Sequence, residues 1–251
     1  MSTILKTPYA KMVELIERNE LNIMSRRFDY HLPEFPHWHK PHAGELRSPI
    51  SFVVLIVIIL QLTLPKSLSL SIQPLVCALE FILAVILFGL NPGRISRHRK
   101  ETWATGIALT SVMTLSNAAS AIQLIRALID GTVKSANSLL AFGGSIWLTN
   151  VVVFGLWYWE FDRGGPGARA EALDPYPDFL FPQMTDPVYA PENWTPKFFD
   201  YLYISFTNAS AFSPTDVMPL SRWAKHLMLI QSVISLITVG LVIARAVNIL
   251  K

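Results

Sequence analysis

Charged side chains are scarce in this sequence. Asp, Glu, Lys and Arg make up 16% of its 251 residues, against roughly 25% in an ordinary soluble domain. Hydrophobic residues make up 51%, and the mean hydropathy is +0.38. Because the apolar residues stand in long runs and not in amphipathic stripes, the composition excludes an ordinary soluble enzyme and predicts an all-α integral membrane protein.

Recognisable catalytic motifs are missing as well. The single cysteine, Cys77, excludes a disulfide framework and a cysteine-based metal cluster. The sequence has no Gly-x-Ser-x-Gly elbow, no His-Glu-x-x-His pair and no phosphate-binding glycine loop. We therefore expect no enzymatic activity, no cofactor and no bound metal.

The basic residues and the histidines have plain interpretations. The net charge is only +3, and the basic residues flank apolar runs instead of lining a groove with interleaved aromatics, so nucleic-acid binding is not expected. Four histidines near the N-terminus could bind a transition metal or sense pH. Neighbouring prolines keep this backbone extended, and we interpret it as a solvated loop beside the membrane. These histidines are His31, His37, His39 and His42.

Five apolar runs are interpreted as transmembrane helices. They cover 49–64, 75–91, 103–129, 137–159 and 223–250. The first two lie near the lower length limit for crossing roughly 30 Å of hydrocarbon, and each can borrow flanking residues. Before them, residues 8–24 have the apolar spacing of an amphipathic helix.

Basic residues predict the orientation of these runs. Residues 1–48 hold seven of them and 92–102 hold four, whereas 65–74 and 130–136 hold one each. The positive-inside rule therefore places the N-terminus in the cytoplasm, in a multi-pass protein of the cell membrane. The linker 160–197, rich in glycine, proline and carboxylates, would then be cytoplasmic too.

A short aromatic segment precedes the last run. Residues 198–212 are compatible with a helix but too short to span the bilayer. The Ser-Pro-Thr-Asp sequence at 213–216 favours irregular backbone, which is tolerated at membrane depth only inside protein or beside water. A short helix that enters and returns before a span is the plan of an ion-channel pore domain. The fold we expect therefore has five transmembrane helices plus one re-entrant pore-like helix.

The chain divides into three parts on this interpretation. Residues 1–48 form an amphipathic and basic region beside the membrane, and 49–136 form a three-helix transmembrane region. Residues 137–251 form a pore-like domain, made of an outer helix, a polar linker, the re-entrant helix, a filter-like strand and an inner helix.

The C-terminal part resembles the pore domain of bacterial potassium channels. Over 197–251, with the fourth apolar run in the place of the outer helix, the resemblance is carried by Asp200, Tyr203, Ser205, Phe206, Asp216, Pro219, Ser221, Trp223, Ala224, Lys225, Val242, Ala244, Arg245 and Asn248. The resemblance implies a homotetramer around the last span that conducts inorganic cations. The whole chain also resembles a family of bacterial multi-pass membrane proteins, which implies no particular function.

The filter departs from the channel family. Potassium channels have Thr-x-Gly-Tyr-Gly where this chain has Ala-Phe-Ser-Pro-Thr at 211–215. The family's glycines allow backbone angles that serine avoids and that proline, with φ fixed near −65°, cannot adopt. The usual carbonyl cage is not expected, and side chains would contact the ion instead. The candidate pore residues are Asn208, Ser210, Ala211, Phe212, Ser213, Pro214, Thr215 and Asp216.

Two functions remain open at this point. In the first, the chain is a cation channel in which a ring of Asp216 carboxylates attracts cations. In the second, it is a non-conducting membrane scaffold or sensor on a channel-derived fold, whose partner binds the basic N-terminal region. Asp216 then only braces the re-entrant turn.

Glu80 lies in the middle of the second apolar run. A carboxylate at that depth is costly and indicates a function or a polar partner. The candidate partners are polar residues of the third run, Asn117, Gln123 and Arg126. The pairing would either orient helices or form a proton or ion relay.

Overall fold

Long helices dominate the computed structural model, which describes residues 37–133, 135–185, 188, 190–191, 193–211 and 216–250. The helices are α2 (Ser48–Thr63), α3 (Gln73–Leu90), α4 (Lys100–Ile129), α5 (Ala136–Phe161), α6 (Pro166–Ala170), α7 (Pro182–Thr185), α8 (Phe198–Ala211) and α9 (Arg222–Leu250). The short 3-10 helices are η1 (His37–His39) and η2 (Asp162–Gly164), and the two-residue strands are β1 (Glu45–Leu46), β2 (Arg94–Ile95), β3 (Phe179–Leu180) and β4 (Met218–Pro219). The amphipathic helix expected over 8–24 lies outside the described residues.

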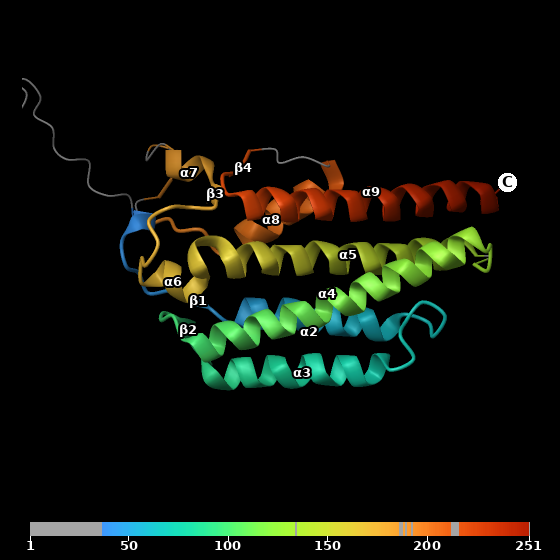
Figure 1. The fold of residues 1–251 in the computed structure, drawn as a ribbon, viewed down its shortest axis with the longest axis horizontal. Helices are drawn as coiled ribbons and strands as arrows, with labels where there is room; N and C mark the ends of the chain where they lie inside the picture. Colours follow the sequence, from blue (N-terminus) through green and yellow to red (C-terminus); the bar gives the residue numbers. More distant parts are fainter. Residues whose placement is uncertain are drawn as a thin grey trace, which may run out of the picture. The chain divides into compact units, whose positions relative to one another are not determined.

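Helix α5 is the common neighbour in this arrangement. It packs against α2, α4, α8 and α9, while α3 packs against α2 and α4. Helices α2 to α5 run in alternating directions, and α9 runs opposite to α5 (Figure 1). Pro49 and Pro74 stand in the first turns of α2 and α3, where the missing N–H has no helical partner to lose.

A tight turn joins α4 to α5. Gly131 has a φ of +67°, and the Thr132 amide donates to the Ala127 carbonyl oxygen at 3.1 Å, as in a Schellman motif. The Ser135 hydroxyl then accepts a hydrogen bond from the Ser138 amide at 3.4 Å and caps the start of α5. These local signals make α4 and α5 antiparallel neighbours.

Four helices are long and apolar enough to cross a membrane, namely α3, α4, α5 with the turn that follows it, and α9. Helix α2 is apolar but shorter, at 16 residues. The outward face of α3 carries Leu79, Ile82 and Val85, which are 46%, 53% and 54% exposed. Lipid can cover apolar faces of this kind. The all-helical fold predicted from the sequence is confirmed, and the four long apolar helices fit the predicted membrane class.

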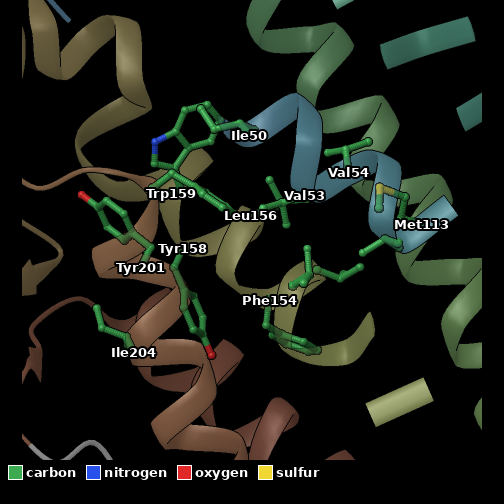
Figure 2. Packing of buried hydrophobic residues seen from close by; sticks show 14 of the residues in the cluster. Ile50, Val53, Val54, Met113, Phe154, Leu156, Tyr158, Trp159, Tyr201 and Ile204 are labelled. Atoms are coloured by element: carbon green, nitrogen blue, oxygen red, sulfur yellow. The ribbon is translucent and has the colours of Figure 1, made fainter. Parts of the chain in front are cut away.

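The buried core surrounds α5. Figure 2 shows Val53 of α2 beside Leu156 of α5, Val54 of α2 beside Met113 of α4, and Tyr158 of α5 beside Tyr201 of α8. The two tyrosines are fully buried, and their hydroxyl groups point to different sides of the cluster. Helix α5 therefore has an aliphatic contact with α2 on one side and an aromatic contact with α8 on the other.

The segment 160–197, which its composition predicts to be a polar linker, contains an end cap. We use this name for residues 162–197, which include η2, α6, β3 and α7. The difference has a physical reason, because its buried charges Asp162, Arg163 and Arg169 bind partners inside the protein instead of facing water. Strand β3 pairs antiparallel with β4.

The end cap lies at the same end of the helices as two other segments. Strands β1 and β2 pair antiparallel, which joins the chain before α2 to the loop after α3. The His42 amide donates to the Ala170 carbonyl at 2.9 Å, and the His98 amide donates to Glu171 Oε2 at 2.9 Å. We call this the basic end, because it carries Arg47, Arg94, Arg97 and Arg99.

Candidate functional site

The most distinctive feature is the hairpin between α5 and α9. Helix α8 has 14 residues, which gives it a length of about 21 Å at 1.5 Å per residue. It packs against α5 and α9, and the chain then comes back to β4 beside β3 (Figure 1). The Leu220 amide donates to the Asp178 carbonyl at 2.8 Å, and Trp223 Nε1 donates to Asp178 Oδ1 at 2.8 Å. The hairpin therefore begins and ends at the basic end.

A buried polar network fastens α8 to α5 and α9. Gln231 Nε2 donates to Ser205 Oγ at 2.6 Å, and Asn208 Nδ2 donates to Gln231 Oε1 at 2.8 Å. Asn208 Nδ2 also donates to the Met228 carbonyl at 2.9 Å, while the Tyr158 hydroxyl donates to Gln231 Oε1 at 2.6 Å. Gln231 and Ser205 are fully buried, and Asn208 is 2% exposed. The network fixes the position of α8 within one chain.

The candidate pore residues are not equivalent in the structure. Asn208 faces α9, whereas Ser210 and Ala211 are exposed near the end of α8, and the Ser210 hydroxyl donates to the Phe206 carbonyl at 2.8 Å. Asp216 is exposed on the way back to β4. The remaining candidates, Phe212, Ser213, Pro214 and Thr215, lie outside the described residues.

Glu80 is fully buried, and its partner is Gln61 of α2. Gln61 Nε2 donates to Glu80 Oε1 at 3.3 Å, and Gln61 Oε1 accepts from Gln73 Nε2 at 2.8 Å and from Ser116 Oγ at 2.7 Å. This network joins α2, α3 and α4 through side chains at 0–4% exposure. It supports a role for Glu80 in orienting helices.

The three predicted partners of Glu80 take no part in that network. Asn117 is buried, Gln123 is half-buried and Arg126 is exposed. The expected partners lie on α4, whereas the hydrogen-bonded partner of Glu80 is Gln61 of α2, and α4 joins this network through Ser116. Asn117 is the next residue to Ser116 and points about 100° away from it around α4. Gln61 was missed because it stands near the end of an apolar run, where a polar residue reads as a boundary.

A buried ion pair at the basic end was not predicted either. Arg169 Nη2 lies 3.4 Å from Glu45 Oε1, and the two side chains are 2% and 7% exposed. Glu45 also accepts hydrogen bonds from Trp159 Nε1 at 3.0 Å and from the Phe198 amide at 2.8 Å. Burial raises the pKa of the Glu45 carboxyl, while Arg169 and these donors oppose the rise. Glu45 thus ties the first residue of α8 to α5 and α6.

Asp162 extends this arrangement to the hairpin. Its carboxylate accepts from the Tyr201 hydroxyl at 2.5 Å and from the Asp178 amide at 2.8 Å. Arg169 Nη1 donates to the Asp162 carbonyl at 2.8 Å. Arg163, the next residue in the chain, donates from Nη1 to the Trp38 carbonyl at 2.7 Å. The end cap therefore positions both the start of α8 and the strand to which the chain returns.

The histidine segment shows no metal geometry in the part of the chain that the structure describes. His31 lies outside that part, and no group of three or more His, Cys, Asp or Glu side chains within it is placed to hold a metal ion. The His42 Nδ1 atom instead accepts a hydrogen bond from the Gly44 amide at 3.1 Å.

Comparisons with protein families, curated proteins and solved structures find no match to this chain. Its function therefore has to be argued from the hairpin, the polar networks and the end cap.

Proposed function

We propose that this chain is a channel-like membrane protein with five transmembrane helices and one re-entrant helix, and that it conducts cations as a homotetramer. The observation that carries the proposal is the α8 hairpin. Helix α8, with 14 residues, packs against the two long apolar helices α5 and α9. The chain after it comes back to the basic end, where β4 pairs with β3. This is the arrangement that a pore loop needs, with irregular backbone reaching into the bilayer only where protein surrounds it.

Strand pairing supports the proposed count of five spans. Between β1 and β2, which pair at the basic end, the chain contains only α2, α3 and their connection. Helix α3 is long enough to cross the bilayer, and we propose that α2 crosses as well and brings the chain back. At 1.5 Å per residue its 16 residues reach about 24 Å, and flanking residues can supply the rest.

The basic end is proposed to face the cytoplasm. Most of the described arginines lie in three segments at this end, namely the chain before α2, the loop after α3 and the end cap. The positive-inside rule places such arginine-rich loops in the cytoplasm. The hairpin would then enter from the cytoplasmic side, opposite to the direction in the potassium channels that the sequence resembles.

Cysteine labelling in intact cells tests this orientation. With Cys77→Ala as background, a membrane-impermeant maleimide should label Asp130→Cys and leave Ser96→Cys unlabelled, because these exposed residues lie at opposite ends of α4 and its flanking loops. Labelling of Ser96→Cys alone would reverse the orientation.

Conduction itself is tested by cation flux in proteoliposomes. We expect wild-type protein to carry a cation flux and Asp216→Asn to lower it several-fold, since the substitution removes the carboxylate ring proposed to attract cations. Arg126→Gln is the matched control, because Arg126 is an exposed charge at the other end of the bundle. Absence of flux through wild-type protein of proven fold would contradict the proposal.

A non-conducting scaffold or sensor is the second candidate function. It is favoured by one observation, that the Asn208 amide nitrogen already donates to Met228 and Gln231 of its own chain. A side chain with these partners stabilises the hairpin and is not available to contact an ion. Only the exposed candidate residues would then be left to contact a cation. This candidate expects a monomer and an unchanged fold and partner binding in Asp216→Ala.

A further inference from the structure

A small cavity lies at the basic end, apart from the hairpin. It has a volume of about 20 Å³, and Arg47, Thr102 and Glu160 are among the residues that line it. A second cavity of about 30 Å³ is also lined by Arg47 and Glu160. The two cavities therefore share a cation that precedes α2 and a carboxylate near the end of α5.

Two side-chain atoms of the residues that line the first cavity lack hydrogen-bond partners within the described chain. Arg47, Thr102 and Glu160 are 5%, 8% and 6% exposed. Among the described residues none accepts a hydrogen bond from Arg47 Nε or pairs with Thr102 Oγ1. The charge of Arg47 acts on the Glu160 carboxylate, and Trp103 Nε1 donates to the Glu160 backbone carbonyl at 3.4 Å. Two opposite charges and a hydroxyl thus surround the same space.

Empty space between such groups would be costly. A buried hydroxyl without a hydrogen-bond partner lowers stability, and a buried charge without one lowers it further. A water molecule needs roughly 10–15 Å³ of this kind of volume and 2–4 polar partners. Both cavities are large enough for water, and both are too small for a phosphate or an organic ligand. Water is therefore the ligand that fits their size and chemistry.

The surrounding sequence makes room for the carboxylate. A Cβ atom added at Gly106 of α4 would overlap Glu160 Oε1. Glycine at this position is therefore what allows the Glu160 side chain to lie against α4.

The first cavity reaches solvent on one side. Arg97 and Arg99, which line it, are exposed at the basic end. The second cavity reaches Ser51 and Val54, which also line an apolar groove of about 230 Å³ between α2 and α3. Water can therefore enter from the basic end, whereas the opposite side is apolar.

We propose that Arg47, Thr102 and Glu160 bind ordered water that connects the buried Glu160 carboxylate to solvent, and that this site exchanges protons with the basic end. In the exchange, a hydronium ion donates its proton through the bound water to Glu160, an O–H bond forms on the carboxylate, and a water molecule remains. Arg47 stays charged and Thr102 orients the water. The charged and titratable groups that face Glu160 are Arg47, Glu45, Arg97, His98, Arg99 and Arg169.

Infrared difference spectroscopy on the full chain in nanodiscs tests the site. Wild-type protein stepped between pH values should show a reversible carboxylic C=O band that shifts in D₂O. The band should be absent in Glu160→Gln and present in Glu80→Gln, which alters a second buried carboxyl that lies elsewhere in the bundle. Identical spectra for wild type and Glu160→Gln would overturn the proposal.

A second variant keeps the test independent of folding defects. Thr102→Val preserves the shape of the side chain and removes only the hydroxyl. It should shift the frequency of the Glu160 band and slow its hydrogen–deuterium exchange, because one partner of the water is lost. An unchanged band and exchange rate in Thr102→Val would show that no water bridges these residues. The result does not depend on whether the protein conducts cations.

Discussion

Glu45 and Arg169 form a buried ion pair although 124 positions separate them in the chain. Glu45 precedes α2, and Arg169 lies in α6 of the end cap. The pair brings together segments that flank the four helices α2 to α5, and Glu45 also accepts a hydrogen bond from the first amide of α8. The position of the hairpin therefore depends on residues far from it in sequence.

Breaking this pair on one side should strongly destabilise the protein. Arg169→Met leaves Glu45 buried without its counter-ion, and we expect a loss of about 3–5 kcal/mol in the free energy of unfolding. Denaturation in mixed micelles measures this loss, with Arg126→Gln as an exposed control. The double variant Glu45→Met with Arg169→Met should lose less than the sum of the single variants. Additive losses would mean that the two charges do not interact.

Acid should weaken the end cap through His42. Burial, followed by the nearby charges of His37, Arg169 and Arg163, lowers the pKa of His42 from 6.5 to about 4. The unfolded chain then binds more protons than the folded chain between these two values, so stability falls as the pH drops through this window. We expect a loss of about 1–2 kcal/mol after allowance for the partial exposure of the ring.

His42→Gln should flatten this pH dependence, and His226→Gln, at an exposed site in α9, should leave it in place. The measurement is the unfolding midpoint at a series of pH values from 7 down to 4. An unaltered pH profile in His42→Gln would exclude this residue as the cause.

The hydrogen-bond network between α8 and α9 is expected to stabilise the folded protein. Asn208→Ala removes the donor to Gln231 and Met228, and we expect it to cost about 1–2 kcal/mol. Ser210→Ala, two residues further on an exposed site, should change stability by less than about 0.5 kcal/mol. Unfolding in mixed micelles compares the two. Normal stability of Asn208→Ala together with altered cation flux would instead assign Asn208 to ion contact.

Gln61 should matter more for stability than the charge of Glu80. Gln61→Leu takes the donor away from buried Glu80 Oε1 and should cost about 1–3 kcal/mol. Glu80→Gln keeps the size of the side chain and its acceptor oxygen, so we expect less than about 1 kcal/mol. The same unfolding measurement decides between them, and a larger loss in Glu80→Gln would show that the charge itself is needed.

The helices could be predicted from the sequence because their signals are local. The expected run 49–64 is α2 at Ser48–Thr63, and 223–250 is α9 at Arg222–Leu250. Hydrophobic run length and proline position fix both. The start of α8 at Phe198 was also expected, because aromatic side chains there follow a proline-rich segment.

The partners of buried polar residues could not be predicted in the same way. Glu45 and Arg169 carry no periodic pattern that links them, and each reads as an ordinary loop charge. Glu160 stands beside an aromatic cluster and reads as the end of a span, although it lies against Gly106 of α4. Such contacts depend on how helices rotate against one another, and one residue changes that direction by about 100°.

The subunit count of the protein in nanodiscs, measured by native mass spectrometry, tests the channel proposal most directly. A pore-loop filter needs several subunits around one axis, because a single α8 hairpin cannot enclose a pore. The account predicts a tetramer that persists at low protein concentration. A stable monomer would contradict it and would leave the scaffold or sensor as the function to pursue.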